Sequence, residues 1–468
     1  MDRLGRTCYA SSNFSGLKQL RIERDRAAAA EESAIATIAF LIEHEEGHLN
    51  PTFRLARRLS ARRHRVAYLG LADGGDFVRA QGFEFVPILT GTFPRGTIRT
   101  LRERARTAGE AGESDAAAEI GAAARPGPDS DYARSWRGLL DAGAELDRTV
   151  AELAPDLFIL TSFYVPHALV LRARYRLPIV LLTTLLRTSP KSEFAIEMGR
   201  LLMFSGAARE RFTALLAGSG PAPKRAAELA PRLLAWVLRM RELILCPADL
   251  ELPGQSHERE PEVHYVEATV DLERRAEAPF PWERLDPRRR LLYVSLGSQS
   301  HRADRERAAG FLRAAAEAFA DRPSWQLVLS TGGLLDPAEI PAPSGAIITG
   351  WAPQLDLLDR AAVAVTHGGL GTIKECIVRG VPMVVFPIDN DQPDNARRVA
   401  HHGLGVRGNL GSFSPASIAA LVEKADRPAV RESLARMQQR FLAIEDSGIG
   451  VRLVEELLVP EKPCQPSR

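Results

Sequence analysis

Val363-Ala364-Val365-Thr366-His367-Gly368-Gly369-Leu370-Gly371-Thr372 is an apolar run that ends in a histidine and a glycine-rich turn. A short continuous apolar run is typical of a strand buried on both faces of a parallel sheet. Glycines after such a strand let the backbone approach a ligand closely, and a helix expected to start near Thr372 would turn its first amides toward an anion. Because ligands of open α/β sheets bind beyond the carboxyl ends of the strands, this turn predicts a phosphate site.

Similar runs lie on both sides of this stretch and predict further strands. In the C-terminal half they are Leu291–Ser295, Gln326–Ser330, Ala346–Thr349, Val363–Thr366 and Met383–Phe386. In the N-terminal half they are Ala34–Ile42, Arg65–Leu71, Leu157–Leu160, Ile179–Thr183 and Leu243–Cys246. A helix is expected between the first two N-terminal runs, and the alternation continues along the chain. The expected fold class is therefore α/β, with two Rossmann-like doubly wound domains facing each other across a cleft.

Length and composition are consistent with two domains. The 468 residues exceed one ordinary core, the net charge of +2 indicates neither a nucleic acid nor an acidic membrane as partner, and the four scattered cysteines favour a reducing cytoplasm. No apolar run is long enough to span a membrane. We expect a polar extension over 1–33, an N-terminal domain over 34–270, a linker over 271–290, a C-terminal domain over 291–458 and a tail over 459–468.

Gly47-His48-Leu49-Asn50-Pro51 follows the first predicted strand. Asn50 is a favourable helix cap and Pro51 a favourable first-turn residue, which predicts a helix from there through Arg63. An imidazole at this strand end can accept the proton of a hydroxyl near neutral pH. His44 is a nearby alternative.

The C-terminal half also carries an ordered set of residues that is more specific than any single turn. The set is Trp351-Ala352-Pro353-Gln354, His367-Gly368-Gly369, Glu375, Gly380-Val381-Pro382, Pro387, Asp391-Gln392 and Asn395-Ala396. This order and spacing resemble the donor-binding signature of the UDP-glycosyltransferase superfamily, whose members have the GT-B fold and include bacterial natural-product and plant secondary-metabolite enzymes. The chain differs from the plant pattern at Leu370 and Gly371, and is nearer the bacterial one.

The resemblance implies a role for each matching residue. Trp351 would stack on the nucleobase, Gln354 would contact the base or ribose, and Glu375 would bind the ribose hydroxyls. Ser298, His367, Gly369 and Thr372 would hold the diphosphate, while Asp391 and Gln392 would bind the sugar. His48 would be the general base.

Several alternatives stay open at this point. Thr372 and Glu375 also fit a capping box, and Asp391-Gln392 fits a loop before a helix capped by Asp394. Family members often place an aspartate where this chain has Thr161-Ser162-Phe163; Thr161, Ser162 or one of Glu43, Glu45 and Glu46 could replace it, whereas Asp156 is expected at the far end of its strand. Phe163, Tyr164, Met198 and Phe204 are candidates for an apolar acceptor pocket.

The sequence thus predicts an inverting, metal-independent glycosyltransferase without a bound cofactor. Its co-substrate would be a UDP-sugar or dTDP-sugar, and its acceptor a hydroxyl of a small, hydrophobic molecule. A nucleotide-sugar epimerase or hydrolase on the same fold, or a non-catalytic donor-binding helper protein, are the alternatives.

Overall fold

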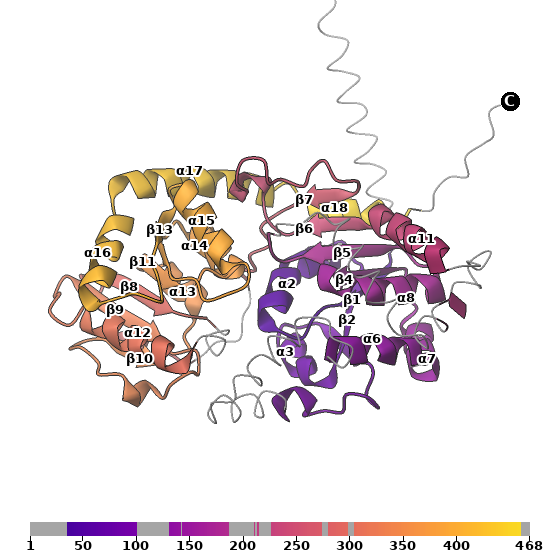
Figure 1. Cartoon of the computed structure of the whole chain (residues 1–468), viewed down its shortest axis with the longest axis horizontal. Coiled ribbons are helices and arrows are strands. Elements are labelled where there is room, and N and C mark those ends of the chain that lie inside the picture. The colour runs from indigo at the N-terminus through magenta and orange to yellow at the C-terminus, as the bar shows by residue number, and fades with distance from the viewer. Residues whose placement is uncertain are drawn as a thin grey trace, which may run out of the picture.

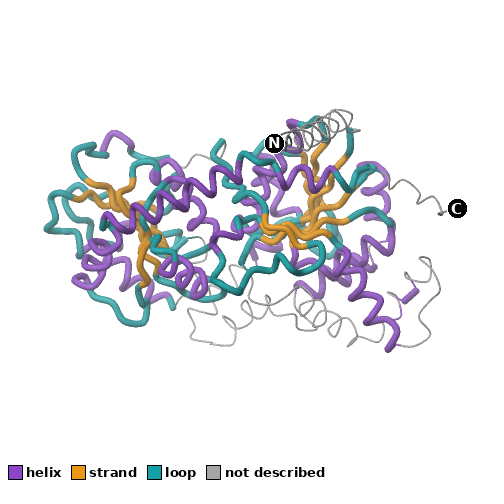
Figure 2. Tube along the Cα trace, turned by 90° about the horizontal axis from the view of Figure 1, so that it is seen from above, coloured by secondary structure: helices purple, strands orange, loops and turns teal. Residues whose placement is uncertain are grey.

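The structure is a computed structural model that describes residues 35–100, 131–141, 143–186, 210, 213–214, 226–273, 279–297 and 304–459. The predicted extension 1–33, most of the tail, and the candidate residues Ser298, Met198 and Phe204 lie outside the described residues. Two domains lie side by side, the N-terminal one in indigo to magenta and the C-terminal one in orange (Figure 1). Seen from above, their sheets form two separate groups of strands (Figure 2).

The N-terminal domain contains a seven-stranded parallel sheet in the order β3-β2-β1-β4-β5-β6-β7. Its strands are β1 (Thr37–Leu41), β2 (Arg65–Gly70), β3 (Glu84–Pro87), β4 (Leu157–Thr161), β5 (Ile179–Thr183), β6 (Arg241–Ile244) and β7 (Val263–Tyr265). Its helices include α2 (Glu46–Ala61), α3 (Gly75–Ala80), α6 (Asp131–Asp141), α7 (Gly143–Leu153), α8 (Val165–Tyr175) and α11 (Ala226–Arg239). The order reverses between β1 and β4, which is the topological switch point where such sheets bind ligands.

The C-terminal domain repeats this plan with a six-stranded parallel sheet in the order β10-β9-β8-β11-β12-β13. Its strands are β8 (Arg290–Ser295), β9 (Trp325–Ser330), β10 (Ile347–Thr349), β11 (Ala361–Thr366), β12 (Met383–Val385) and β13 (Gly405–Arg407). Its helices are α12 (Arg305–Glu317), α13 (Gln354–Leu358), α14 (Leu370–Arg379), α15 (Gln392–His401), α16 (Pro415–Ala425) and α17 (Pro428–Glu445), and α18 (Ile449–Glu455) follows them. Its switch point lies between β8 and β11.

Alternate residues of each strand face opposite layers of helices, as the period of two requires. In β1, Ala39 and Leu41 pack with α6, α7, α8 and α11, whereas Ile38 and Phe40 pack with α2 and α18. Helices cover both faces of the sheet, which explains why its strands read as continuous apolar runs rather than alternating ones. The predicted two-domain, doubly wound fold is confirmed.

Each strand predicted from the sequence is present, with ends shifted by a few residues. The prediction missed β3, β7 and β13, three short strands that lie at sheet edges. The predicted start of the first helix was wrong: α2 begins at Glu46, Asn50 does not cap it, and Pro51 lies inside the helix. Pro51 therefore gives up a bond to the carbonyl of Gly47, and His48 belongs to the first helical turn rather than to a preceding loop.

Helix α18 returns to the N-terminal domain. Residues through 458 were expected in the C-terminal domain, but Val451 and Val454 of α18 join the apolar cluster formed by β1 and α2. The long helix α17 leads across the top of the molecule toward this position (Figure 1).

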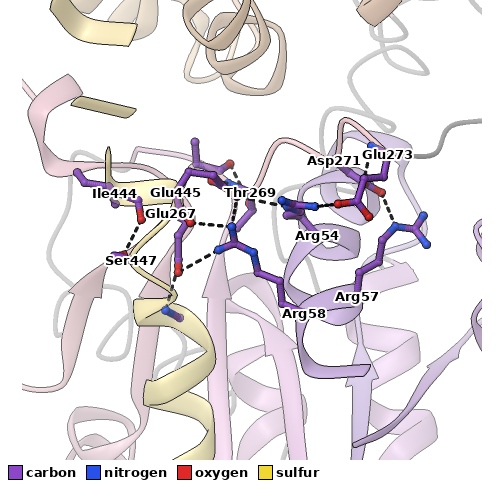
Figure 3. A network of polar contacts seen from close by, with 12 residues as sticks. Arg54, Arg57, Arg58, Glu267, Thr269, Asp271, Glu273, Ile444, Glu445 and Ser447 are labelled. Atoms are coloured by element: carbon purple, nitrogen blue, oxygen red, sulfur yellow. Dashed lines mark hydrogen bonds and ion pairs between the residues drawn. The ribbon is translucent and has the colours of Figure 1, made fainter. Parts of the chain in front are cut away.

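Arginines of α2 bind both segments that cross between the domains (Figure 3). Arg54 pairs with Glu273 and Glu445, Arg57 Nε lies 3.0 Å from Asp271 Oδ2, and Arg58 pairs with Glu445 at 3.1 Å. Because one crossover contains residues 271–273 and the other residue 445, the helix that carries His48 is fixed to both.

Candidate functional site

His48 lies beside the N-terminal switch point and makes two polar contacts. Its Nδ1 is 2.7 Å from Thr184 Oγ1, and its Nε2 is 3.6 Å from Glu43 Oε2. Thr184 follows β5 and is buried, whereas Glu43 follows β1. Glu43 was one of the partners suggested by the sequence. Thr184 was missed, because nothing in its local sequence shows that the end of β5 reaches the first turn of α2.

Thr161, another suggested partner of His48, and Asp156, which was expected at the far end of its strand, have different surroundings. Thr161 is fully buried, and its Oγ1 has no hydrogen-bond partner among the described residues. Asp156 accepts a hydrogen bond from Thr37 N at 2.8 Å, which places it at the amino end of the sheet as predicted. A threonine and a glutamate thus contact the imidazole, and neither occupies the sequence position of the usual aspartate.

The two described acceptor candidates differ in their contacts. Phe163 meets His48 edge to face, with ring centroids 5.2 Å apart, so it borders the proposed base. Tyr164 packs against His167 with centroids 4.3 Å apart and contributes to the core under α8. Phe163 is therefore the candidate that the structure brings to the site.

Glycines of two turns, one after β8 and one after β11, lie on either side of the His367 ring. A Cβ atom built on Gly297 would lie 2.4 Å from His367 Cε1, and one on Gly369 would lie 2.6 Å from Nε2, so only glycine fits on either side of the ring. Burial lowers the pKa of His367 to about 4, which leaves the imidazole neutral at pH 7. Gly368 has φ of +89°, and a Cβ there would meet Val385, which explains the second glycine of the turn.

Glu375 and Gln354 are brought together by α13 and α14. Gln354 Nε2 donates to Glu375 Oε2 at 2.5 Å and to Thr372 Oγ1 at 3.3 Å, while Tyr293 OH donates to Gln354 Oε1 at 3.3 Å. The helix starts at Leu370 with Gly369 as its N-cap residue, so the expected start at Thr372 was wrong and Thr372 caps nothing. Glu375 therefore has no capping-box role here.

Trp351 follows β10 in the C-terminal domain. Its side chain is 53% exposed, and a Cβ on Gly333 would lie 3.5 Å from the indole ring. One part of the ring thus lies beside Gly333, while much of it is open. A supported, open indole is suited to stacking with a planar ligand.

Asp391 and Gln392 begin α15. Asp391 is the N-cap residue, so Asp394 does not cap this helix and pairs with Arg397 instead. Gln392 Oε1 accepts hydrogen bonds from Ile388 N at 2.8 Å and Asp389 N at 3.2 Å. That oxygen therefore stabilises the loop that precedes α15.

The surroundings of the Asp391 carboxyl act on its pKa in both directions. Burial raises its pKa, while a hydrogen bond from Asn395 and the charges of His48 and Arg398 act in the opposite direction. Among the described residues, no group of three or more His, Cys, Asp and Glu could hold a metal ion, and no helix is long and apolar enough to cross a membrane.

The site thus combines a histidine with threonine and glutamate contacts on one domain, and a glycine turn, an open indole and the buried Glu375 on the other. Residues 269–437 match the family model described as UDP-glucoronosyl and UDP-glucosyl transferase. The demethyllactenocin mycarosyltransferase of Streptomyces fradiae is 28% identical over 439 residues, covering 91% of this chain and 87% of that protein. The oleandomycin glycosyltransferase of Streptomyces antibioticus is 28% identical over 460 residues, covering 92% of each.

Solved structures give the same result over nearly the whole chain. The glycosyltransferase of kitacinnamycin has a TM-score of 0.64 at 27% identity, covering 91% of this chain and 99% of that one. The calicheamicin glycosyltransferase CalG4 has a TM-score of 0.63 at 25% identity, covering 91% and 98%. We conclude that the chain is a glycosyltransferase with the GT-B fold, that residues 269–437 form its UDP-glycosyltransferase-type domain, and that nearly its whole length is similar to bacterial natural-product glycosyltransferases.

Proposed function

We propose that this enzyme transfers a sugar from a nucleoside diphosphate sugar to a hydroxyl of a small apolar acceptor, with inversion at the anomeric carbon. The observation that carries the proposal is the position of His48, held by Thr184 and Glu43 at the switch point of one domain, together with the donor signature around the switch point of the other. A base on one side of the anomeric carbon and a leaving diphosphate on the other is the arrangement that a single in-line displacement needs.

His48 is the proposed general base. If Nδ1–H donates to Thr184 Oγ1, the lone pair of Nε2 is free to accept the proton of the acceptor hydroxyl. As that oxygen attacks the anomeric carbon, the imidazole becomes positively charged. Glu43 Oε2, 3.6 Å from Nε2, stabilises this charge, while Thr184 holds the ring orientation.

The departing diphosphate is proposed to bind at the glycine turn. The first amides of α14 and the positive end of its dipole attract the anion, and neutral His367 and Thr372 can each donate one hydrogen bond. Ser298 would complete this set beyond the described residues. Stabilisation of the leaving group by these donors supports a reaction without a metal ion.

The donor is assigned to Trp351, Gln354, Glu375, Asp391 and Gln392. Trp351 would stack on the base, Gln354 and Glu375 would bind the base and ribose, and Asp391 with Gln392 would bind the sugar hydroxyls. We assign a pyrimidine base, because the matched family model is named for UDP-sugar transferases and thymine differs from uracil by one methyl group. Phe163, at the edge of His48, borders the proposed acceptor pocket.

The proposal is tested with UDP-sugars and dTDP-sugars crossed against a panel of macrolide and phenolic acceptors, read by mass spectrometry and by the anomeric proton coupling of the product. We expect one nucleoside diphosphate released per sugar transferred, product of inverted configuration, and turnover that survives excess chelator. Consumption of donor without any acceptor would indicate an epimerase or hydrolase. Nucleotide binding with no turnover of any kind would indicate a donor-binding helper protein.

A further inference from the structure

A buried ion pair joins the two domains behind the donor site. Glu251 follows β6 in the N-terminal domain, and Arg398 lies in α15. Glu251 Oε2 is 2.8 Å from Arg398 Nη2 and accepts from Nε at 3.0 Å, and the two side chains are only 2% and 1% exposed. The attraction within such a pair is largely offset by the cost of removing both charges from water, so the pair adds little net stability.

Arg398 reaches the donor site through one amide. Its Nη1 donates to Asn395 Oδ1 at 3.3 Å, and Asn395 Nδ2 donates both to Gly368 O at 3.0 Å and to Asp391 Oδ2 at 2.8 Å. Flipping this amide would turn its oxygen toward a carbonyl and a carboxylate. Because Arg398 can only donate, its bond to Oδ1 selects the orientation that holds the glycine turn and Asp391 together.

The other end of the chain of contacts is anchored in the N-terminal sheet. Tyr265 of β7 donates its hydroxyl to Glu251 Oε1 at 3.0 Å, and His402 Nε2 lies 3.1 Å from Glu251 O. Both carboxylate oxygens of Glu251 are therefore occupied, one by its own domain and one by the opposite domain.

We propose that Arg398 is a positioning residue. Through its contacts with Glu251 and Asn395, it couples the position of the N-terminal domain to the orientation of Asp391 and Gly368. Displacement of the domains would separate the Arg398 guanidinium from Glu251 and from the Asn395 amide. The glycine turn at Gly368 and the Asp391 carboxyl would then lose their fixed orientation together. The inference rests on the proposed function in one respect, namely that Asp391 binds the sugar of the donor.

The test uses Arg398→Lys, which keeps a cation beside Glu251 but loses the fork that reaches Asn395. Calorimetry with the nucleotide sugar should show an affinity about 10- to 100-fold weaker, the range expected for losing a hydrogen-bonded carboxylate contact. Affinity for the nucleoside diphosphate alone should fall less, because it lacks the sugar. Asp249→Asn is the matched control: it removes an exposed contact of 3.1 Å between the same segment and Arg440, and should change affinity less than about twofold.

A second variant, Asn395→Ser, leaves the ion pair intact and should reproduce the loss even if Arg398→Lys folds poorly. In the double variant the two effects should not add, because they act through one amide. Unchanged nucleotide-sugar affinity in folded Asn395→Ser, or strictly additive losses, would overturn the proposal.

A readout without ligand separates this inference from the proposed function. Titration of ¹³C-labelled aspartate should show the pKa of Asp391 rising further in Asn395→Ser, because the hydrogen bond that lowers it is lost. If the wild type binds no nucleotide sugar but this shift appears, the proposed function fails and the positioning role stands. If the wild type binds and the variant shows neither the shift nor the loss, the positioning role fails alone.

Discussion

Thr184→Val tests how this enzyme manages without the usual aspartate beside its base. Valine keeps the shape of threonine but removes the hydroxyl that lies 2.7 Å from His48 Nδ1 in a buried setting. A hydrogen bond to a group that becomes charged contributes about 1.5–3 kcal/mol. Since about 1.4 kcal/mol is tenfold in rate, kcat should fall about 10- to 150-fold.

The assay is initial-rate transfer at saturating donor, with an alkyl alcohol and a more acidic phenol as acceptors. The loss should be smaller for the phenol, which needs less assistance from a base. Thr184→Ser keeps the hydroxyl and should retain most of the activity, and nucleoside diphosphate affinity should be unchanged in both variants because it depends on the other domain. A folded Thr184→Val enzyme with kcat within about twofold of wild type would refute the role of Thr184.

Three further predictions concern the donor site and the domain junction. Glu375→Ala should weaken nucleoside diphosphate binding by about 1–3 kcal/mol in calorimetry; unchanged affinity would remove Glu375 from the ribose site. His367 should stay neutral in NMR titrations of the folded protein down to about pH 5, because its pKa is lowered to about 4. Between about pH 6.5 and about pH 4 this histidine binds a proton in the unfolded chain but not in the folded one, so the free energy of unfolding should fall as the pH drops through this range. Asp271→Asn should cost about 3–5 kcal/mol in denaturant unfolding, because its carboxylate is 2% exposed and paired with Arg57, whereas Glu273→Gln, 61% exposed, should cost less than about 1 kcal/mol; equal costs would contradict the burial argument.

Residues near one another in the sequence were the easiest to interpret. The strand ending at Thr366 was predicted from its continuous apolar run, and the turn after it from its glycines. The structure shows that the space beside two of the glycines is filled by the ring of His367. Helix starts were harder to predict. Asn50, Thr372 and Asp394 all resemble caps, yet α2, α14 and α15 each begin earlier, because strand ends and tertiary packing fix where the chain turns.

Contacts across the fold could not be read from the sequence. Thr184 meets His48 from a distance of 136 residues, and Arg398 meets Glu251 across 147. The return of α18 to the N-terminal domain was also missed, because an apolar helical stripe does not say which sheet it will cover. Period and turn chemistry predict elements, whereas the partners of a catalytic side chain depend on how the sheets bring distant segments together.

His48→Ala gives the most direct test of the central claim, that a histidine of the N-terminal domain activates the acceptor while the C-terminal domain holds the donor. Wild type and variant are compared for sugar transfer to an unactivated alcohol, with nucleoside diphosphate affinity measured on the same samples. The account predicts a loss of transfer of at least about a hundredfold, with unchanged nucleotide affinity, because general-base assistance contributes about 10²–10⁴-fold and the donor residues lie on the other domain. Near wild-type transfer by a folded His48→Ala enzyme would contradict the account and make His44 the next residue to test.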